Sequence, residues 1–304
     1  MPALIVPPKK KVVAIIKGGL GNQLFQFAAA RRLAFKNGAE LVLDDRTGFE
    51  RDYTYRRSFE LGNFAHGCMI ASMSDRLEPL GRLRRRFRKW LNRIKPQNLR
   101  RYVEESSPEF DPQVLSLSWD GSLTLDGYWQ SELYFKDCEG EIRNNLVPSS
   151  PNPYEEIGVL RRIMEEESVS VHLRYFDSKP AAISRNVQPE YLNLALSMMR
   201  KSIPNAQFFI FSDNLERARH ALHSEKNVTF VRYMHPAITS RSEFQLMAAC
   251  RHHIIANSTF SWWSAWLSSH PAKTVIAPGQ KIRGPDGTLV WGFRGLLPKE
   301  WYVI

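Results

Sequence analysis

Short apolar runs alternate with amphipathic stretches through the second half of the chain. The apolar runs have four to seven residues and are typical of buried strands, whereas the stretches between them have apolar positions at helical spacing. This alternation predicts a parallel sheet with helices on both faces. The predicted strands are residues 168–174, 207–212, 228–232, 253–256 and 274–277, and the predicted helices are residues 189–202, 214–223, 242–250 and a segment from about residue 260 that Pro271 closes.

The first half of the chain begins with the same pattern. Residues 12–17 form a buried-type strand, residues 18–23 a glycine-rich loop, and a helical pattern then runs to about residue 36, ahead of a strand at residues 41–44. Open parallel sheets bind ligands beyond the carboxyl ends of their strands. The glycine-rich loop lies at such an end and is therefore a candidate ligand-binding loop.

The middle of the chain is less regular and contains the best candidate for a domain boundary. A strand-like run covers residues 123–129, and turn-forming residues fill the segment Pro-Ser-Ser-Pro-Asn-Pro at residues 148–153. A chain of 304 residues is at the upper limit of what one core serves. We therefore expect two domains, residues 1–150 and residues 151–304.

The composition is that of a globular protein, with 43% hydrophobic and 24% charged residues. The three cysteines, Cys68, Cys138 and Cys250, are isolated in the sequence, which argues against a disulfide framework or a zinc site. No apolar run approaches the roughly 20 residues of a membrane span, and the start of the chain does not have the order of a signal peptide. These features predict a protein of the cytoplasm.

The formal net charge of +11 is concentrated in one segment. Residues 82–101 contain ten Lys or Arg and no Asp or Glu, so the rest of the chain has a formal charge of only +1. Apolar side chains fall at helical spacing among these basic residues: Leu80, Leu83, Phe87, Trp90, Leu91 and Ile94. This basic amphipathic helix, near residues 80–101, either lies on an anionic membrane surface or packs its apolar stripe on its own domain. No recognition module or aromatic ladder accompanies the charge, so it does not indicate nucleic-acid binding.

A polar corner joins the predicted strand at residues 253–256 to the next helix. Its residues Asn257, Ser258 and Thr259 are of the types that cap helix starts, because their side-chain oxygens accept bonds from otherwise unpaired N–H groups. A helix start that follows a strand also binds phosphates, since its free N–H groups and positive dipole end face the anion. The corner is therefore either a phosphate site or an ordinary capped helix.

The helix after this corner is rich in aromatic residues. Phe260 and Ser261 open the helix, next to the candidate phosphate position. We expect Trp263 and Trp266 in the core, while the pattern assigns Trp262 to neither the core nor the site.

Two other predicted strands end in polar residues. His172 and Arg174 lie at the end of one strand and share a face, because alternate residues of a strand point the same way. Ser212 and Asp213 end the next strand, and all these strand ends should converge with the corner. The arginine side chain is a permanently charged fork suited to a diphosphate. The alternative is a surface arginine beside a histidine that is satisfied in the core.

The glycine-rich loop has a weak dinucleotide-binding pattern. Gly19 and Gly21 have the required spacing, but no third glycine follows. Asp44 or Asp45 lies at about the right distance along the chain to bind a ribose.

We instead expect the loop to approach a different kind of ligand. Its glycines allow backbone N–H groups to come close, and Asn22 and Gln23 add polar side chains. A purely structural turn is the alternative.

The sequence shows no evident site for a catalytic metal. No Asp-x-Asp motif occurs, so no carboxylate pair is apparent for a metal bound to a nucleotide diphosphate. A diphosphate that leaves without a metal needs an arginine and a helix dipole to stabilise its growing charge. Arg174 and the helix start at Ser258 and Thr259 are groups of this kind. We therefore expect no metal and no cofactor.

Four motifs give the chain a family resemblance. They are Gly18-Gly-Leu-Gly-Asn-Gln-Leu-Phe-Gln, His172-Leu-Arg, Phe211-Ser-Asp-Asn and Asn257-Ser-Thr-Phe-Ser-Trp-Trp, in this order between about residues 13 and 278. Together they resemble the α-1,2-fucosyltransferase family of GDP-fucose-dependent transferases. The resemblance implies a GT-B-like fold, with two Rossmann-like α/β domains facing a central cleft, an N-terminal acceptor side and a C-terminal domain that binds GDP-fucose. It also implies inverting, metal-independent transfer of L-fucose to the 2-hydroxyl of a terminal galactose.

The same resemblance implies roles for individual residues. Asn22 approaches the fucose and the reaction centre, and Arg174 neutralises the β-phosphate as it leaves, with His172 beside it. Asp213 contacts the nucleoside. The residues near the diphosphate are Ser258, Thr259 and Phe260.

One position departs from the family pattern. The family usually has His-x-Arg-Arg-x-Asp, whereas Tyr175 stands here in place of the second arginine. The related protein O-fucosyltransferases resemble this chain in having only the first arginine. No motif marks the general base; Asp177 is a candidate, or it holds Arg174 or the base in position.

These observations predict a cytoplasmic fucosyltransferase whose partners are GDP-fucose and a galactose-terminated glycan or glycolipid. Its acceptor would be, for example, a lipid-linked surface polysaccharide repeat, with the basic helix near the inner face of the membrane. One rival function uses the same scaffold with another GDP-sugar or acceptor hydroxyl. A rival of a different class is a non-catalytic protein that binds membranes or nucleic acid through residues 82–101.

Overall fold

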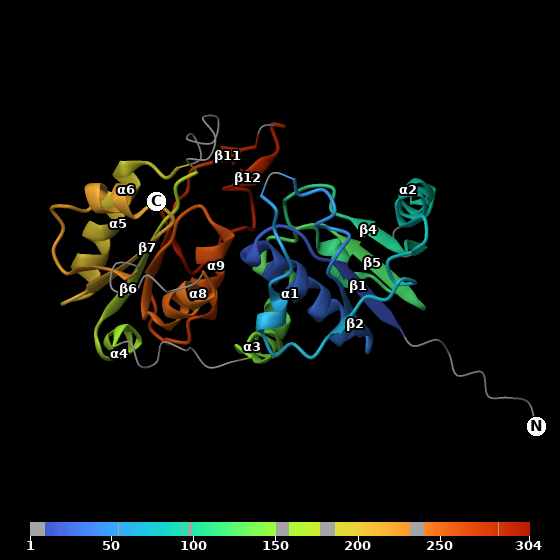
Figure 1. Cartoon of the computed structure of the whole chain (residues 1–304), viewed down its shortest axis with the longest axis horizontal. Helices are drawn as coiled ribbons and strands as arrows, with labels where there is room; N and C mark the ends of the chain where they lie inside the picture. The colour runs from blue at the N-terminus through green and yellow to red at the C-terminus, as the bar shows by residue number, and fades with distance from the viewer. Residues whose placement is uncertain are drawn as a thin grey trace, which may run out of the picture. The chain divides into compact units, whose positions relative to one another are not determined.

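A computed structural model of the chain describes residues 10–53, 55–92, 94–96, 99–149, 158–176, 186–231, 240–284 and 286–304. The chain divides into two compact units, Met1–Ser149 (unit 1) and Ser150–Ile304 (unit 2). Each unit is built on a parallel sheet of its own (Figure 1). The predicted α/β class is therefore confirmed for both halves of the chain.

Unit 1 contains a five-stranded sheet in the order β3-β2-β1-β5-β4, and all its pairings are parallel. Its strands are β1 (Lys11–Ile15), β2 (Glu40–Asp44), β3 (Met69–Ile70), β4 (Tyr102–Glu104) and β5 (Ser122–Asp126). Its helices are α1 (Leu20–Lys36), α2 (Gly81–Leu91) and α3 (Glu139–Asn145), with short 3-10 turns at Leu61–Asn63, Pro112–Ser116, Glu132–Tyr134 and Lys136–Cys138. Strand β1 has a neighbour on each side, which is why its apolar residues 12–15 are buried.

Helix α1 covers the sheet of unit 1 and ties the two ends of the unit together. Its Arg32 Nη2 lies 2.9 Å from Asp137 Oδ2, and its Arg31 Nη2 lies 2.6 Å from Glu141 Oε1. Both carboxylates lie in the last part of the unit, in or just before α3. The opening β-loop-α motif is therefore held in place by residues more than a hundred positions away.

Unit 2 contains a six-stranded parallel sheet in the order β13-β10-β9-β6-β7-β8. Its strands are β6 (Ser168–Leu173), β7 (Gln207–Ser212), β8 (Val228–Phe230), β9 (His252–Ile254), β10 (Val275–Ala277) and β13 (Tyr302–Val303), and β11 (Ile282–Arg283) pairs antiparallel with β12 (Leu289–Trp291). Its helices are α4 (Val159–Glu165), α5 (Pro189–Ser202), α6 (Leu215–Ala221), α8 (Ser240–Ala249) and α9 (Thr259–Leu267). The predicted strands and helices of this half are confirmed, with ends shifted by a few residues. Arg232 and most of the predicted linker at residues 148–153 lie outside the described residues.

Helix α9 is buried deeply in unit 2. Trp262 and Trp263 are fully buried and Trp266 is 4% exposed. The indole nitrogen of Trp262 donates to the carbonyl of Leu296 at 2.9 Å. The predicted core positions of Trp263 and Trp266 are confirmed, and Trp262 belongs to the core as well.

A lysine, rather than the predicted proline, closes helix α9. The helix ends at Leu267, before Pro271. The Lys273 ammonium group donates to three carbonyls at this end, at 2.8, 3.0 and 2.9 Å, from Ala265, Trp266 and Ser268. A cation here satisfies carbonyls that lack a helical partner and complements the negative end of the helix dipole.

Two further observations concern the chain as a whole. Its three cysteines are free, with Cys138 and Cys250 buried and Cys68 half-buried. In the part of the chain that the structure describes, no helix combines the length and the apolar character that crossing a membrane requires.

Candidate active site

Three strands of unit 2 end in polar residues at one edge of the sheet. Strand β6 lies between β9 and β7, and the last residue of β6 is opposite the last residue of β7. Because the strands are parallel, their carboxyl ends meet at the same edge, where open sheets bind ligands. Arg174, Asp213 and the corner that begins at Asn257 follow these three ends. The structure thus brings together the polar strand ends that the sequence predicts to converge.

Asp213 orients Arg174 at the end of β6. The Arg174 Nη1 atom lies 2.9 Å from Asp213 Oδ2, and Asp213 Oδ1 accepts the amide of Tyr175 at 2.9 Å. The guanidinium carbon also lies 5.5 Å from the centroid of the Phe176 ring. The Arg174 and Asp213 side chains keep 33% and 28% of their surface exposed. Arg174 is therefore held in one direction but open to an anion from solvent. A contact between Asp213 and a nucleoside stays a prediction.

His172 is a buried, neutral neighbour of Arg174. Its side chain is 8% exposed, its ring centroid lies 5.9 Å from that of Phe260, and its Nδ1 atom has no hydrogen-bond partner within the described structure. Burial, and secondly the charge of Arg174, lower the pKa of His172 to about 3. The imidazole is therefore neutral near pH 7. It can exchange a hydrogen bond with a ligand, but it adds no positive charge against a phosphate.

The start of α9 differs from the predicted side-chain cap. Ser258 occupies the N-cap position with an extended backbone (φ −139°, ψ 126°), but its side chain makes no capping bond in the described structure. Its carbonyl accepts the amide of Trp262 at 2.9 Å, which begins the helical ladder. The capping role predicted for Ser258 is wrong. The side-chain oxygen of Ser258 therefore does not occupy the first amides of the helix, and anion binding at this helix start stays a prediction. Asn257 is buried and Thr259 half-buried at this corner.

Two serines predicted to touch a ligand bind their own turns. Ser212 Oγ donates to the carbonyl of Asn214 at 3.1 Å, and Ser261 Oγ donates to the carbonyl of Ser258 at 3.1 Å. Ser212 is 3% exposed and Ser261 is fully buried. A hydroxyl has one proton to donate, and here it is used within the turn. These hydroxyl protons are therefore not available to a ligand, and a contact between either residue and a ligand stays a prediction.

Side chains from outside the motifs support the segment after Arg174. Asn186, which is 9% exposed, accepts the amide of Phe176 on Oδ1 at 2.9 Å. The guanidinium of Arg217, on α6, lies 4.3 Å from the ring centroid of Tyr175. Tyr175 stands where the family pattern has its second arginine. Arg217 thus brings a guanidinium group to this position from another element. Sequence reasoning missed both residues because neither belongs to a motif.

In unit 1, the glycine-rich loop connects β1 to α1. Gly18 has a φ of +77°, a backbone conformation that favours glycine, and a side chain there would come within 2.7 Å of Asn22 Nδ2. Gly19 is the N-cap residue of α1, and Gly21 is buried in the first turn. Asn22 is half-buried, and its Oδ1 accepts a bond from Gln130 Nε2 at 2.9 Å. The loop thus presents Asn22 at the carboxyl end of the sheet of unit 1.

Gln23 has a structural role in this loop. It is fully buried, and its Nε2 donates to the carbonyls of Gly18 and Ser58, both at 2.8 Å. Its Oε1 accepts the amide of Glu60 at 2.8 Å. Both amide protons are therefore used inside unit 1. We correct the prediction that the Gln23 side chain approaches a ligand.

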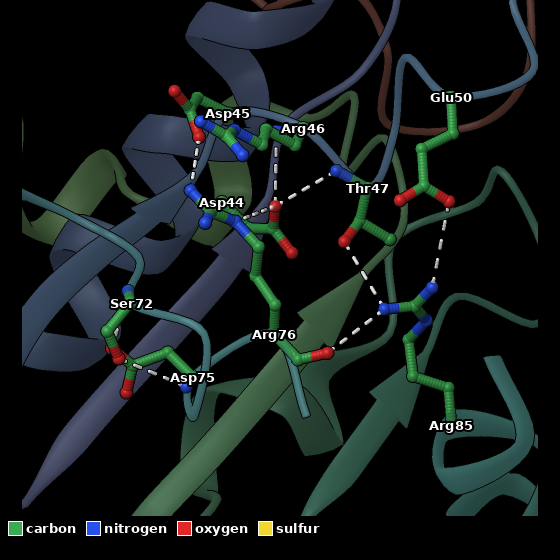
Figure 2. Close-up of polar contacts among 9 residues, drawn as sticks. All are labelled: Asp44, Asp45, Arg46, Thr47, Glu50, Ser72, Asp75, Arg76 and Arg85. Carbon is green, nitrogen blue, oxygen red and sulfur yellow. Dashed lines mark hydrogen bonds and ion pairs between the residues drawn. The ribbon is translucent and has the colours of Figure 1, made fainter. Parts of the chain in front are cut away.

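Asp44 and Asp45, the residues considered for a ribose contact, bind Arg76 instead (Figure 2). The Arg76 Nη2 atom lies 2.7 Å from Asp45 Oδ1, and Arg76 Nε lies 3.4 Å from Asp44 Oδ1. Asp44 Oδ1 also accepts the amides of Arg46 and Thr47, at 3.2 and 3.0 Å. The Arg76 and Asp44 side chains are 7% and 2% exposed. This is a structural ion pair, and the dinucleotide interpretation loses its acidic residue.

The predicted base and the predicted absence of a metal stay predictions. Asp177 lies outside the described residues. Within the described ranges, no group of three or more His, Cys, Asp or Glu could hold a metal ion.

Sequence comparisons relate the chain to bacterial glycosyltransferases. The model of glycosyl transferase family 11 matches residues 11–282. An α-1,2-colitosyltransferase of Escherichia coli is 29% identical over 280 residues, which cover 88% of this chain and 91% of the relative. The O-antigen biosynthesis glycosyltransferase WbnK of Escherichia coli is 27% identical over 289 residues, which cover 88% and 94%.

Solved structures share the fold. FUT1 of Arabidopsis thaliana, a mutant in complex with GDP, aligns with a TM-score of 0.55 at 13% identity, covering 93% of this chain and 73% of that one. The α-1,6-fucosyltransferase NodZ, co-crystallised with GDP, aligns with a TM-score of 0.50 at 15% identity, covering 84% and 91%. At such identities the likeness shows the fold alone. It confirms the predicted GT-B-like α/β class.

Proposed function

The chain belongs to glycosyl transferase family 11, and from this premise we propose that it transfers L-fucose from GDP-fucose to a galactose 2-hydroxyl of a glycan or glycolipid. Membership of the family makes the chain a glycosyltransferase. The fucosyl donor is supported by the four motifs from Gly18 to Trp263. The 1,2-linkage is supported by the similarity to an α-1,2-colitosyltransferase.

The observation that carries the proposal is the Arg174–Asp213 pair at the strand ends of unit 2. In an inverting transfer, the bond between the sugar C1 and the β-phosphate oxygen breaks while the acceptor oxygen bonds to C1 from the opposite side. Negative charge then grows on the diphosphate. Arg174, oriented by Asp213 at 2.9 Å and one-third exposed, offers its fork to that charge. The start of α9 adds N–H groups and the positive end of its dipole.

We propose that these groups act without a metal. Two sources of positive potential, the guanidinium and the helix start, suit the charge of a leaving diphosphate. Neutral His172, with a pKa of about 3, supplies a hydrogen bond rather than charge or general-base catalysis. The proton of the acceptor hydroxyl goes to a base, for which Asp177 stays our candidate.

We further propose a division of labour between the units. Unit 2 binds the donor through Arg174 and the α9 corner, and unit 1 binds the acceptor, with Asn22 as its candidate catalytic residue. We propose the cytoplasmic side of the membrane as its place of action. Free cysteines and the basic segment at residues 82–101 support this location.

A second donor is favoured by the 29% identical α-1,2-colitosyltransferase. Colitose is fucose without its 3-hydroxyl, so the same diphosphate site serves either GDP-sugar. Only a group that hydrogen-bonds the 3-hydroxyl would separate the two donors. A site that hydrogen-bonds the 3-hydroxyl of fucose would reject colitose, which lacks this hydroxyl.

The proposal is tested by incubating the chain with a galactose-terminated acceptor and, in parallel, GDP-fucose or GDP-colitose, with EDTA present. We expect fucose on the 2-hydroxyl by NMR, at a rate that EDTA does not change. Transfer of colitose alone rejects the fucosyl donor, and a product on another hydroxyl rejects the linkage. Loss of activity in EDTA that Mg²⁺ restores rejects the metal-free mechanism.

A further inference from the structure

Helix α2 is attached to unit 1 through a polar face, beginning with Arg85. Arg85 Nη1 donates to Thr47 Oγ1 at 3.3 Å and to the carbonyl of Arg76 at 3.1 Å, and its Nη2 lies 4.0 Å from Glu50 Oε2 (Figure 2). The Arg85 side chain is only 13% exposed. One arginine of this highly basic helix therefore points into the unit, toward the ion pairs of Asp44, Asp45 and Arg76.

Lys89 and Asn92 continue this attachment one and two turns later. Lys89 Nζ lies 2.5 Å from Glu104 Oε1 and 3.2 Å from Asp126 Oδ2, and Asn92 Nδ2 donates to the carbonyl of Tyr102. These partners belong to β4 and β5, and Figure 1 shows α2 beside the β4 edge of the sheet. Residues at i, i+4 and i+7 share one face of a helix. The three anchors therefore define the face of α2 that meets the protein.

The apolar stripe of α2 lies on the opposite face. At 3.6 residues per turn, Leu83, Phe87 and Trp90 lie roughly 140° to 160° around the helix from Arg85. They are 59%, 58% and 53% exposed, and the Phe87 and Trp90 rings stack at a centroid distance of 5.9 Å. Leu80 and Ile94 extend the stripe and are 65% and 70% exposed. The alternative that these five side chains pack on their own domain is wrong, and only Leu91 is half-buried.

Basic side chains border this exposed stripe. Arg84 and Arg86 lie about 100° to either side of Arg85, so they flank the stripe from both sides. Both are exposed, as is Arg82. Residues 82–101 contain no acidic side chain that could neutralise them. The outer surface of α2 is thus an apolar ridge between two positive margins.

We propose that this surface of α2 docks on an anionic lipid bilayer. The stripe of Leu80, Leu83, Phe87, Trp90 and Ile94 enters the interface, and Arg82, Arg84 and Arg86 bind the headgroups. A bilayer presents an apolar layer directly beneath a layer of negative charge, which matches this arrangement. Tryptophan favours that interface, and long arginine side chains reach from the apolar level to the headgroups. A nucleic acid offers the negative charge but no layer for the apolar side chains.

The anchors give this docking a physical advantage. A free amphipathic peptide must order itself when it binds, and ordering opposes binding. Arg85, Lys89 and Asn92 already hold α2 as a helix with its stripe outward. The proposal does not depend on transferase activity, so either can fail without the other.

Vesicle flotation with the full chain tests the proposal. We expect binding to vesicles of phosphatidylcholine with phosphatidylglycerol, little binding to phosphatidylcholine alone, and weaker binding as salt rises. The triple variant Leu83→Gln, Phe87→Gln, Trp90→Gln should lose binding. The triple variant Arg82→Gln, Arg84→Gln, Arg86→Gln should bind on the order of a hundredfold more weakly.

Matched controls come from exposed residues of unit 2. Met164, Leu194 and Tyr302 are 63%, 51% and 58% exposed, so the triple variant Met164→Gln, Leu194→Gln, Tyr302→Gln replaces three exposed hydrophobic side chains elsewhere. The triple variant Arg161→Gln, Lys201→Gln, Lys299→Gln makes the same charge change at exposed positions. Both controls should bind vesicles as the unaltered chain does. Circular dichroism should show all variants folded, because none of the altered side chains is buried.

Fluorescence quenching shows whether Trp90 enters the bilayer, and competition with DNA shows which anionic partner α2 prefers. Lipids brominated on their chains should quench the unaltered chain more than the Trp90→Phe variant. Absence of binding to anionic vesicles, or undiminished binding by the stripe variant, overturns the proposal. Tighter binding to duplex DNA than to vesicles overturns it as well. So does a loss of vesicle binding in the unit 2 controls that equals the loss in the α2 variants.

Discussion

Arg76 in unit 1 and Arg174 in unit 2 are both paired with aspartate, yet their surroundings differ. The Arg76 side chain is 7% exposed and lies between two carboxylates, of Asp44 and Asp45. Arg174 is 33% exposed, and among the described residues its carboxylate partner is Asp213. A buried ion pair braces the fold, whereas a partly exposed pair can turn toward a ligand. Burial separates the two roles, although residue type does not.

The largest expected effect is the loss of transfer in Arg174→Lys. Lysine keeps the charge but not the fork that meets two oxygens, so kcat/KM for GDP-fucose should fall at least about a hundredfold. The free energy of unfolding should change by less than about 1 kcal/mol, because the Arg174–Asp213 pair is exposed. Steady-state kinetics and urea unfolding measure the two effects. If Arg174→Lys retains more than a tenth of the activity, the catalytic role of Arg174 is contradicted.

Arg76→Met should show the reverse behaviour. It leaves Asp44 buried without its cation, which should lower the free energy of unfolding by about 3 to 5 kcal/mol. Arg46→Met is the matched control, because Arg46 is exposed in the turn that follows β2, where its carbonyl accepts the amide of Phe49 at 2.9 Å. The control keeps that backbone bond and should stay within about 0.5 kcal/mol of the unaltered chain.

Urea unfolding followed by circular dichroism measures both variants. A loss of stability in Arg46→Met equal to that in Arg76→Met would show that the turn, rather than the ion pair, carries the effect. An unchanged Arg76→Met would contradict its role as a brace.

His172 is buried next to the partly exposed Arg174, and it should make the free energy of unfolding depend on pH. Its pKa is about 3 in the folded chain, against an ordinary value of 6.5. Between these values the unfolded chain binds a proton that the folded chain does not. The contribution of neutral His172 to the free energy of unfolding is therefore fully present above about pH 6.5. It falls on acidification, by up to about 1.4 kcal/mol per pH unit.

The variant His172→Gln should remove this part of the pH dependence. Urea unfolding at about pH 6 and about pH 5 should show a shallower loss of stability in the variant. His253 is also buried, and burial lowers its pKa. The free energy of unfolding should therefore still fall on acidification in both proteins, but less steeply in the variant. Equal slopes in the two proteins would contradict a buried, neutral His172.

The smallest expected effect concerns Arg217, which covers Tyr175 at 4.3 Å. If it takes over part of the role of the missing second arginine, Arg217→Gln should lower kcat/KM about two- to fivefold. Arg219→Gln, on the same helix, is the control and should leave the rate unchanged. A rate that is the same in both variants would limit the diphosphate site to Arg174 and the α9 start.

The sequence was sufficient to predict the alternation of unit 2 and the convergence of its strand ends. Apolar runs between helical stretches specify parallel strands, and parallel strands place Arg174 and Asp213 at one edge. Local partners were harder to predict. The Ser258 side chain has the right residue type for a cap but makes no capping bond, and Gln23 turns inward to Ser58 and Glu60.

The orientation of α2 also needed the structure. Its spacing predicts an amphipathic helix, and for such a helix the apolar face usually packs inward. Here Arg85 finds Thr47 and the carbonyl of Arg76, partners that precede it by 38 and 9 residues. No local pattern marks those contacts, so the sequence could not show that the apolar face points outward.

Calorimetric titration of GDP in EDTA tests the central claim most directly, because it needs neither an acceptor nor a metal. We expect the unaltered chain to bind GDP and Arg174→Lys to bind it at least about tenfold more weakly. Arg46→Met should bind as the unaltered chain does. Equal affinity in Arg174→Lys, or binding that appears only when Mg²⁺ is added, would contradict a diphosphate site built from Arg174 and the start of α9.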